Sequence, residues 1–191
     1  MSAVAENVDE LVDVFVSYLN AAGFEPKFLD EVPEELRTSR AEYDTFHWQI
    51  RPASSNPWVE TLVEKLPQGW PKPFRSLIDR YRFLSFEIGP LMLFANSGHE
   101  LFYELADRIF KDKGIFPTLH KNGFLQCGLP HETNYDPVCF DMKRRSRADA
   151  PIVQLDHEQL LQWSRIRVVR EIAPSFAQFM QTALAERFPV A

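Results

Sequence analysis

The stretch PVCFDMKRRSRADAPIVQL, residues 137–155, decides the fold class of this chain. Its two ends, 137–142 and 151–155, are short apolar runs typical of strands, and a charged segment separates them. Two such runs joined by a short polar connection predict an antiparallel hairpin. Similar runs at 123–127 and 166–172 precede and follow the hairpin, so we expect a meander of short antiparallel strands.

Helical patterns flank this meander on both sides. Residues 6–22 carry apolar side chains at helical spacing before Gly23, and further helices are expected at 56–65, from Pro73, at 97–113, at 156–163 and from Ser175. Asp156 and Ser175 precede glutamines by three residues, which predicts that both are N-caps. Other strands are expected at 44–51, with Phe46, Trp48 and Ile50 on one face, and on both sides of Gly89-Pro90. The fold class is therefore α+β, an antiparallel sheet flanked by helices.

Composition limits the classes of protein to consider. The 191 residues fit a single domain, 1–191, with a helical and strand extension over 1–55, and 45% hydrophobic content with 16 phenylalanines predicts a real core. Two cysteines, acidic residues near the N-terminus and the lack of a long apolar run predict a cytoplasmic protein with no membrane span. The net charge of -6 argues against nucleic acid as a partner.

The common catalytic motifs are absent, and we expect no enzyme activity, cofactor or metal. The enzyme alternative is a hydrolase in which Cys127 works with His120 or His131. We favour the interpretation that Cys127 and Cys139 are buried, reduced and unreactive, because their neighbours in the predicted strands are apolar. Carboxylates and histidines of the sheet region match no metal-binding spacing.

Several residues are candidates for binding a protein partner. Trp70, framed by Gly69 and Pro71, is either a lid on the core or an exposed anchor. We expect charged and aromatic residues of the sheet region to gather at one rim of a sheet that has one solvated face. Arginines near residue 80 and in the 143–147 hairpin tip add to this set. Structural ion pairing and the solubility of a charged hairpin tip also explain these arginines. These candidates are Arg80, Arg82, Tyr135, Asp136, Asp141, Arg144 and Arg145.

Several blocks, taken in order from about 58 to 184, resemble the SUKH superfamily, the Smi/Knr-type fold. The more specific blocks are YDPVCFD at 135–141 and PIVQLDHE at 151–158. Less specific are LP at 66–67, WPKPF at 70–74, RYRF at 80–83 and APSF at 173–176. The superfamily contains fungal cell-wall assembly regulators and many bacterial immunity proteins.

The resemblance implies a protein-binding scaffold without catalytic residues. Bacterial members often bind and neutralise a toxin domain, so a toxin is the expected partner, and a regulatory or structural scaffold without a toxin is the alternative. An acidic chain suits an inhibitor that covers a basic active site. The extension over 1–55 lies outside the resemblance.

Overall fold

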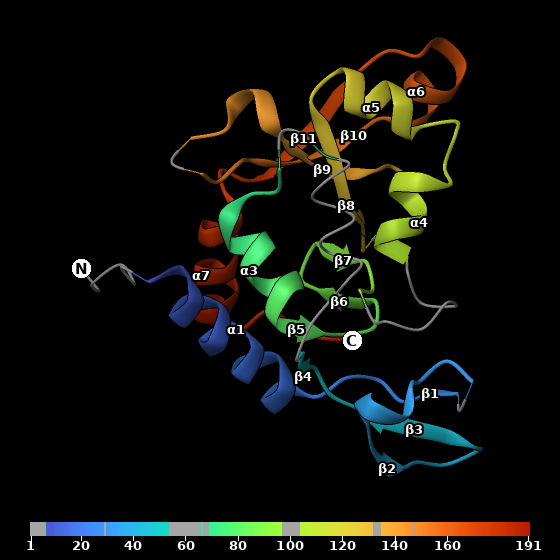
Figure 1. The fold of residues 1–191 in the computed structure, drawn as a ribbon, viewed down its shortest axis with the longest axis vertical. Coiled ribbons are helices and arrows are strands. Elements are labelled where there is room, and N and C mark those ends of the chain that lie inside the picture. Colours follow the sequence, from blue (N-terminus) through green and yellow to red (C-terminus); the bar gives the residue numbers. More distant parts are fainter. Residues whose placement is uncertain are drawn as a thin grey trace.

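A six-stranded antiparallel sheet lies at the centre of the computed structural model (Figure 1), which describes residues 7–28, 30–53, 66, 69–96, 104–131, 135–146 and 148–191. Its strands are adjacent in sequence order, β6 to β11, so the predicted meander and the α+β class are confirmed. The bounds are β6 (Phe86–Ile88), β7 (Leu91–Leu93), β8 (Phe124–Pro130), β9 (Val138–Asp141), β10 (Ile152–Leu155) and β11 (Val168–Ala173).

The central strands are apolar on both faces. Leu125, Phe140 and Ile152 join the main hydrophobic cluster, whereas their neighbours Phe124 and Val153 join a second cluster on the other side. Alternation along a strand sends consecutive side chains to opposite faces, so both faces must be covered. The expectation that one face of the sheet is solvated is wrong for these strands.

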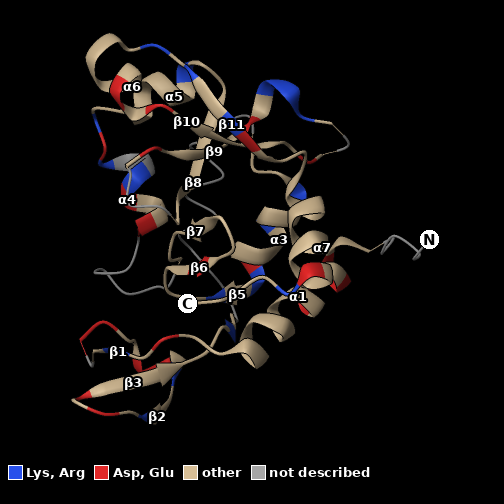
Figure 2. Ribbon diagram, turned by 180° about the vertical axis from the view of Figure 1, so that it is seen from behind, with Lys and Arg blue, Asp and Glu red and all other residues tan. Residues whose placement is uncertain are grey.

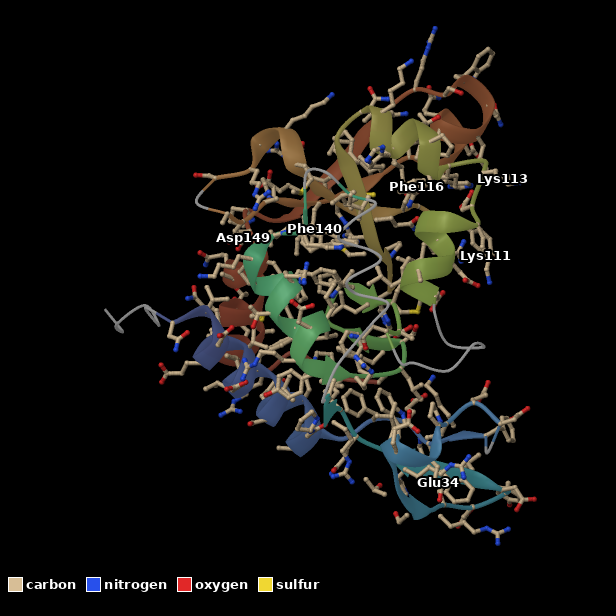
Figure 3. The ribbon with its side chains drawn as sticks, viewed as in Figure 1. Glu34, Lys111, Lys113, Phe116, Phe140 and Asp149 are labelled. Atoms are coloured by element: carbon tan, nitrogen blue, oxygen red, sulfur yellow. The ribbon has the colours of Figure 1, made fainter. Side chains whose placement is uncertain are left out.

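Helices provide the cover on each side (Figure 1). The main cluster includes side chains of α1 (Val8–Ala22), α3 (Lys72–Arg80) and α7 (Phe176–Glu186), and Phe140, labelled in Figure 3, packs 5.0 Å from the ring of Phe74 on α3. The second cluster lies under α5 (Phe116–Lys121) and α6 (His157–Trp163), through Leu119 and Leu160. The helix α4 (Glu104–Phe110) packs beside β8 and α5.

The helix predicted from the 97–113 pattern is shorter in the described residues and is followed by α5, which the pattern missed. The Asp112 carboxylate accepts hydrogen bonds from the Gly114 and Ile115 amides, which favours a turn before Pro117 opens α5. The other predicted helices that fall on described residues are confirmed. The first residues of the helix predicted at 97–113 and the helix predicted at 56–65 lie outside the described residues.

The N-terminal extension forms a three-stranded sheet at the end of α1, in the order β1 (Lys27–Phe28), β3 (Thr45–Trp48), β2 (Arg37–Arg40). The 3-10 helix η1 (Glu34–Leu36) precedes β2, and β4 (Arg51–Pro52) pairs with β5 (Tyr81–Arg82). Trp48 stacks on Phe24 at 4.1 Å, and the side chain of Asn20 bonds the backbone of Ile50. The buried residues of this sheet therefore belong to the main cluster.

The predicted N-caps at Asp156 and Ser175 are confirmed. The Ser175 hydroxyl accepts from the Gln178 amide at 3.0 Å, and the Asp156 carboxylate accepts from the Gln159 amide at 3.0 Å. Asp149, labelled in Figure 3, adds acceptors for the Phe176 and Ala177 amides, so it helps to seat α7. These contacts satisfy amides that the first turn of a helix leaves unpaired.

We expect Ser175→Ala to lower the free energy of unfolding by about 1 kcal/mol, because the Gln178 amide loses its acceptor. Urea unfolding of both proteins measures the difference. An unchanged midpoint would show that Asp149 alone caps this helix.

We expect Gly128→Ala to lower the free energy of unfolding by roughly 2–3 kcal/mol, because the Cβ of the alanine would lie 2.1 Å from the Met92 carbonyl oxygen on β7. Gly114→Ala is the control, since the nearest atom lies 3.5 Å from the added carbon. Thermal unfolding of the two variants should separate them. Equal stability would contradict the close β7–β8 approach.

Candidate functional site

Trp70 is a lid on the core and not an anchor for a partner. It is only 3% exposed, and its ring lies 5.1 Å from Phe74 and 6.4 Å from Phe140. Of the two interpretations that the sequence allowed, the structure selects burial. Trp70 is therefore removed from the predicted binding set.

Arg80 ties two helices together. Its guanidinium lies 2.7 Å from the Asp13 carboxylate of α1 and also donates to the Asp9 carbonyl, while the Tyr81 hydroxyl donates to Asp13 at 2.5 Å. The hydrogen bond from Arg80 holds the pKa of Asp13 below its usual range. Burial, with the bond to Asp13, raises the pKa of Tyr81 to about 12. Arg82 is half-buried in β5, opposite Arg51 of β4.

Asp136 is the centre of a buried polar network. One carboxylate oxygen accepts from the Gln154 amide at 2.7 Å, and the other lies 3.0 Å from the His157 amide and 2.9 Å from its Nδ1. Gln154 in turn accepts from Arg170 of β11 at 2.8 Å. Burial acts to raise the pKa of Asp136, but the hydrogen bonds from His157 and Gln154 outweigh it and lower the pKa.

Asp141 and Arg144 form a second network at the other end of β9. The Asp141 carboxylate accepts from Arg144 at 2.7 Å, and Arg144 also reaches Glu171 of β11 at 2.8 Å. These bonds hold the 3-10 helix η2 (Met142–Arg144) against the sheet. The predicted single rim is wrong, because Asp136 and Asp141 are both buried and lie at opposite ends of one strand.

Only part of the predicted set is exposed to solvent. Tyr135 is 76% exposed, with its ring edge-on to His157 at 6.4 Å, and Arg145 is exposed after η2. Arg144 is half-exposed, but its donors are engaged within the protein. Asp136, Asp141 and Arg144 therefore hold the sheet and η2 together more than they face a partner.

Cys127 and His131, two residues of the enzyme alternative, contact other groups of the protein, and the third, His120, stacks on Phe116 of α5. Cys127 is fully buried and directs its sulfur toward the Val138 carbonyl, and burial raises its pKa and that of Cys139 well above the usual range. His131 lies against Glu87, whereas Asp136 is taken by His157. Among the described residues, no group of three or more His, Cys, Asp or Glu could hold a metal ion.

The structure exposes an apolar group that the sequence analysis missed. Half of the large exposed hydrophobic side chains in the described part of the chain fall within nine residues, on α6 and β11. They are Leu161, Trp163, Val168 and Val169, to which we add the exposed arginines Arg165, Arg167 and Arg170 to define the α6–β11 surface. Trp163 is 61% exposed.

Local contacts explain why these side chains face outward. Leu160 is the buried residue of α6, so Leu161 and Trp163 are turned away from the stripe that packs on the sheet. Ser164 ends α6 in a left-handed conformation, and Ile166 packs back on the second cluster. The Asp156 amide then donates to the Arg167 carbonyl and aligns the start of β11. The surface is thus held in place from beneath.

The two edges of the main sheet differ. At the β6 edge, the Glu87 amide donates to the Ala191 carbonyl at 2.8 Å and the Gly89 amide to Pro189, so the C-terminus covers it. No described strand pairs with the outer edge of β11. Two register shifts and charged side chains along β11 disfavour the addition of another strand. A partner that binds at this edge would therefore contact side chains more than backbone groups.

A scan against protein-family models found no match for the chain, and a search of curated proteins found none either. The resemblance to the SUKH superfamily therefore stays a prediction from the quoted blocks. Among the described residues, no helix is both long enough and apolar enough to cross a membrane.

The Asp136 network yields a pH prediction. The pKa of Asp136 is lower in the folded protein than in the unfolded chain. The ionised carboxylate therefore contributes to the free energy of unfolding above about pH 4, and this contribution is lost as the pH falls through the pKa of the folded protein. Asp136→Asn should therefore lower the free energy of unfolding by roughly 2 kcal/mol at pH 7. Urea unfolding at pH 7 and pH 3 tests this, since the gap between the two proteins should shrink in acid. A constant gap would contradict the assigned cause.

Proposed function

We propose that this chain is a non-catalytic protein-binding module that neutralises a bacterial toxin domain, as immunity proteins of the SUKH superfamily do. The observation that carries the binding proposal is the α6–β11 surface, with its four exposed apolar side chains among arginines. Single exposed apolar residues are ordinary, but a group of this kind is typical of a surface that binds a protein.

The composition of this surface suits tight binding. Tryptophan and arginine are the residue types that contribute most at interfaces, and Trp163 presents a large ring at the end of a helix. Leu160 and Ile166 fix the surface on the second hydrophobic cluster, so little ordering is required when a partner binds. A partner with an apolar pocket for Trp163 and an acceptor for Arg165 fits it, since Arg167 and Arg170 already donate to Asp156 and Gln154.

The toxin is supported by the resemblance alone. Of the two more specific SUKH-like blocks, 151–158 forms β10 and the start of α6, which lie next to this surface, whereas 135–141 forms β9, one strand further in. A scaffold without a toxin partner would use the same surface.

We expect Trp163→Ala to weaken partner binding at least tenfold, about 1.4 kcal/mol, because the ring is the largest exposed apolar group of the surface. The partner is the protein that co-purifies with the chain from the cells that produce it, and titration calorimetry with both purified proteins gives the affinity. Val14→Ala is the matched control, since Val14 is about as exposed on α1.

A growth assay separates the two proposed roles. If the partner is a toxin, its expression alone stops growth, the wild-type chain restores growth and Trp163→Ala fails to do so. A harmless partner points to the scaffold role. An unchanged affinity of the Trp163→Ala variant would show that the partner does not bind at the α6–β11 surface.

A further inference from the structure

The outer face of the N-terminal sheet carries a second exposed aromatic group. Phe28 of β1 pairs with Thr45 of β3, and the register places both on the face opposite the packed side chains of Phe46 and Trp48. Phe28 is 57% exposed, and with Thr45, His47 and Tyr43 it lines an open hollow of about 790 Å³. Nothing in the described part of the chain packs over this hollow.

Tyr43 stands at the tip of the hairpin between β2 and β3. It is 88% exposed, the highest value among the large exposed hydrophobic side chains of the described residues. The Thr45 amide donates to the Glu42 carbonyl at 3.1 Å, and the two residues between them, Tyr43 and Asp44, have φ of 52° and 58°. A hairpin turn with two positive φ angles favours Asn-Gly, and a bulky tyrosine fits it poorly. Folding alone does not select tyrosine here.

Charge indicates what kind of partner suits this face. Residues 25–44 contain seven acidic and three basic residues, a net charge of -4 out of -6 for the whole chain. Figure 2 shows acidic residues in the loops around β1, β2 and β3, and Figure 3 labels Glu34, which begins η1 beside this sheet. Arg40, which also lines the hollow, and Asp44 neutralise each other as an ion pair, and Arg37 lies over the ring of Phe46, so the net charge of -4 comes from the remaining acidic residues. The aromatic hollow is therefore set in a negative field.

We propose that this face, residues 25–28 and 30–47 with Tyr43 at its tip, is a docking surface for a basic protein with a pocket that receives the tyrosine ring. Acidic residues that merely kept the sheet soluble would not require two exposed aromatic rings, which lower solubility. The face lies at the opposite end of the molecule from the α6–β11 surface (Figure 1), so it adds a second binding surface to the proposed function.

The test uses the full chain with a photoreactive phenylalanine analogue at position 43. In the cells that produce the protein, irradiation should cross-link one basic protein at position 43 and not at position 14, an exposed site on α1. The captured protein is purified and titrated with the wild-type chain at low and moderate salt. We expect its affinity to fall at least tenfold as salt rises, because opposite charges attract it.

The deciding variant is the double substitution Tyr43→Asn with Asp44→Gly. It gives the turn its preferred residues, so the thermal unfolding midpoint should rise while affinity for the captured protein falls at least tenfold. Loss of binding then cannot come from loss of folding. No specific cross-link at position 43, or unchanged affinity in the double variant, overturns the inference.

Failure here is distinguishable from failure of the proposed function. A captured protein that binds the double variant normally but not Trp163→Ala leaves the α6–β11 surface standing and removes the hairpin. The reverse result leaves the hairpin standing and removes α6–β11.

Discussion

The strands β8, β9 and β10 carry apolar side chains on both faces, and the rest of the structure follows from the need to cover both. On one side, α1, α3 and α7 close over Leu125 and Phe140, and on the other α5 and α6 close over Phe124 and Val153. The N-terminal sheet extends the first cluster through Trp48. The last strand, β11, differs from these central strands, because its first four residues are all exposed.

Covering both faces determines what the polar residues do. Asp136 and Asp141 are buried at the two ends of β9, where a carboxylate is tolerated only if donors surround it. Gln154 and His157 satisfy the first, and Arg144 satisfies the second. Asp136, Asp141 and Arg144, which the sequence offered as binding residues, therefore hold the sheet together.

Local rules made most of the fold predictable from sequence. Short apolar runs identified the strands of the main sheet and alternation identified β3, whereas β1 and β2 were missed. The Asp156 and Ser175 caps followed from spacing alone. The candidate site was less predictable, since the burial of Trp70 and the pairing of Arg144 with Glu171 depend on segments distant in sequence. The outward turn of Trp163 had a local signal, because Leu160 alone fits the inward stripe of that short helix. The left-handed Tyr43 had none, since tyrosine does not mark such a turn.

Hydrogen exchange of the chain, alone and bound to the protein that co-purifies with it, tests the central claim most directly. The claim is that the α6–β11 surface is where that protein binds. The account predicts that backbone amides of residues 161–171 exchange more slowly in the complex, while those of β8 and β9, already buried, keep their rates. Unchanged exchange over 161–171, with new protection elsewhere on the chain, would contradict it.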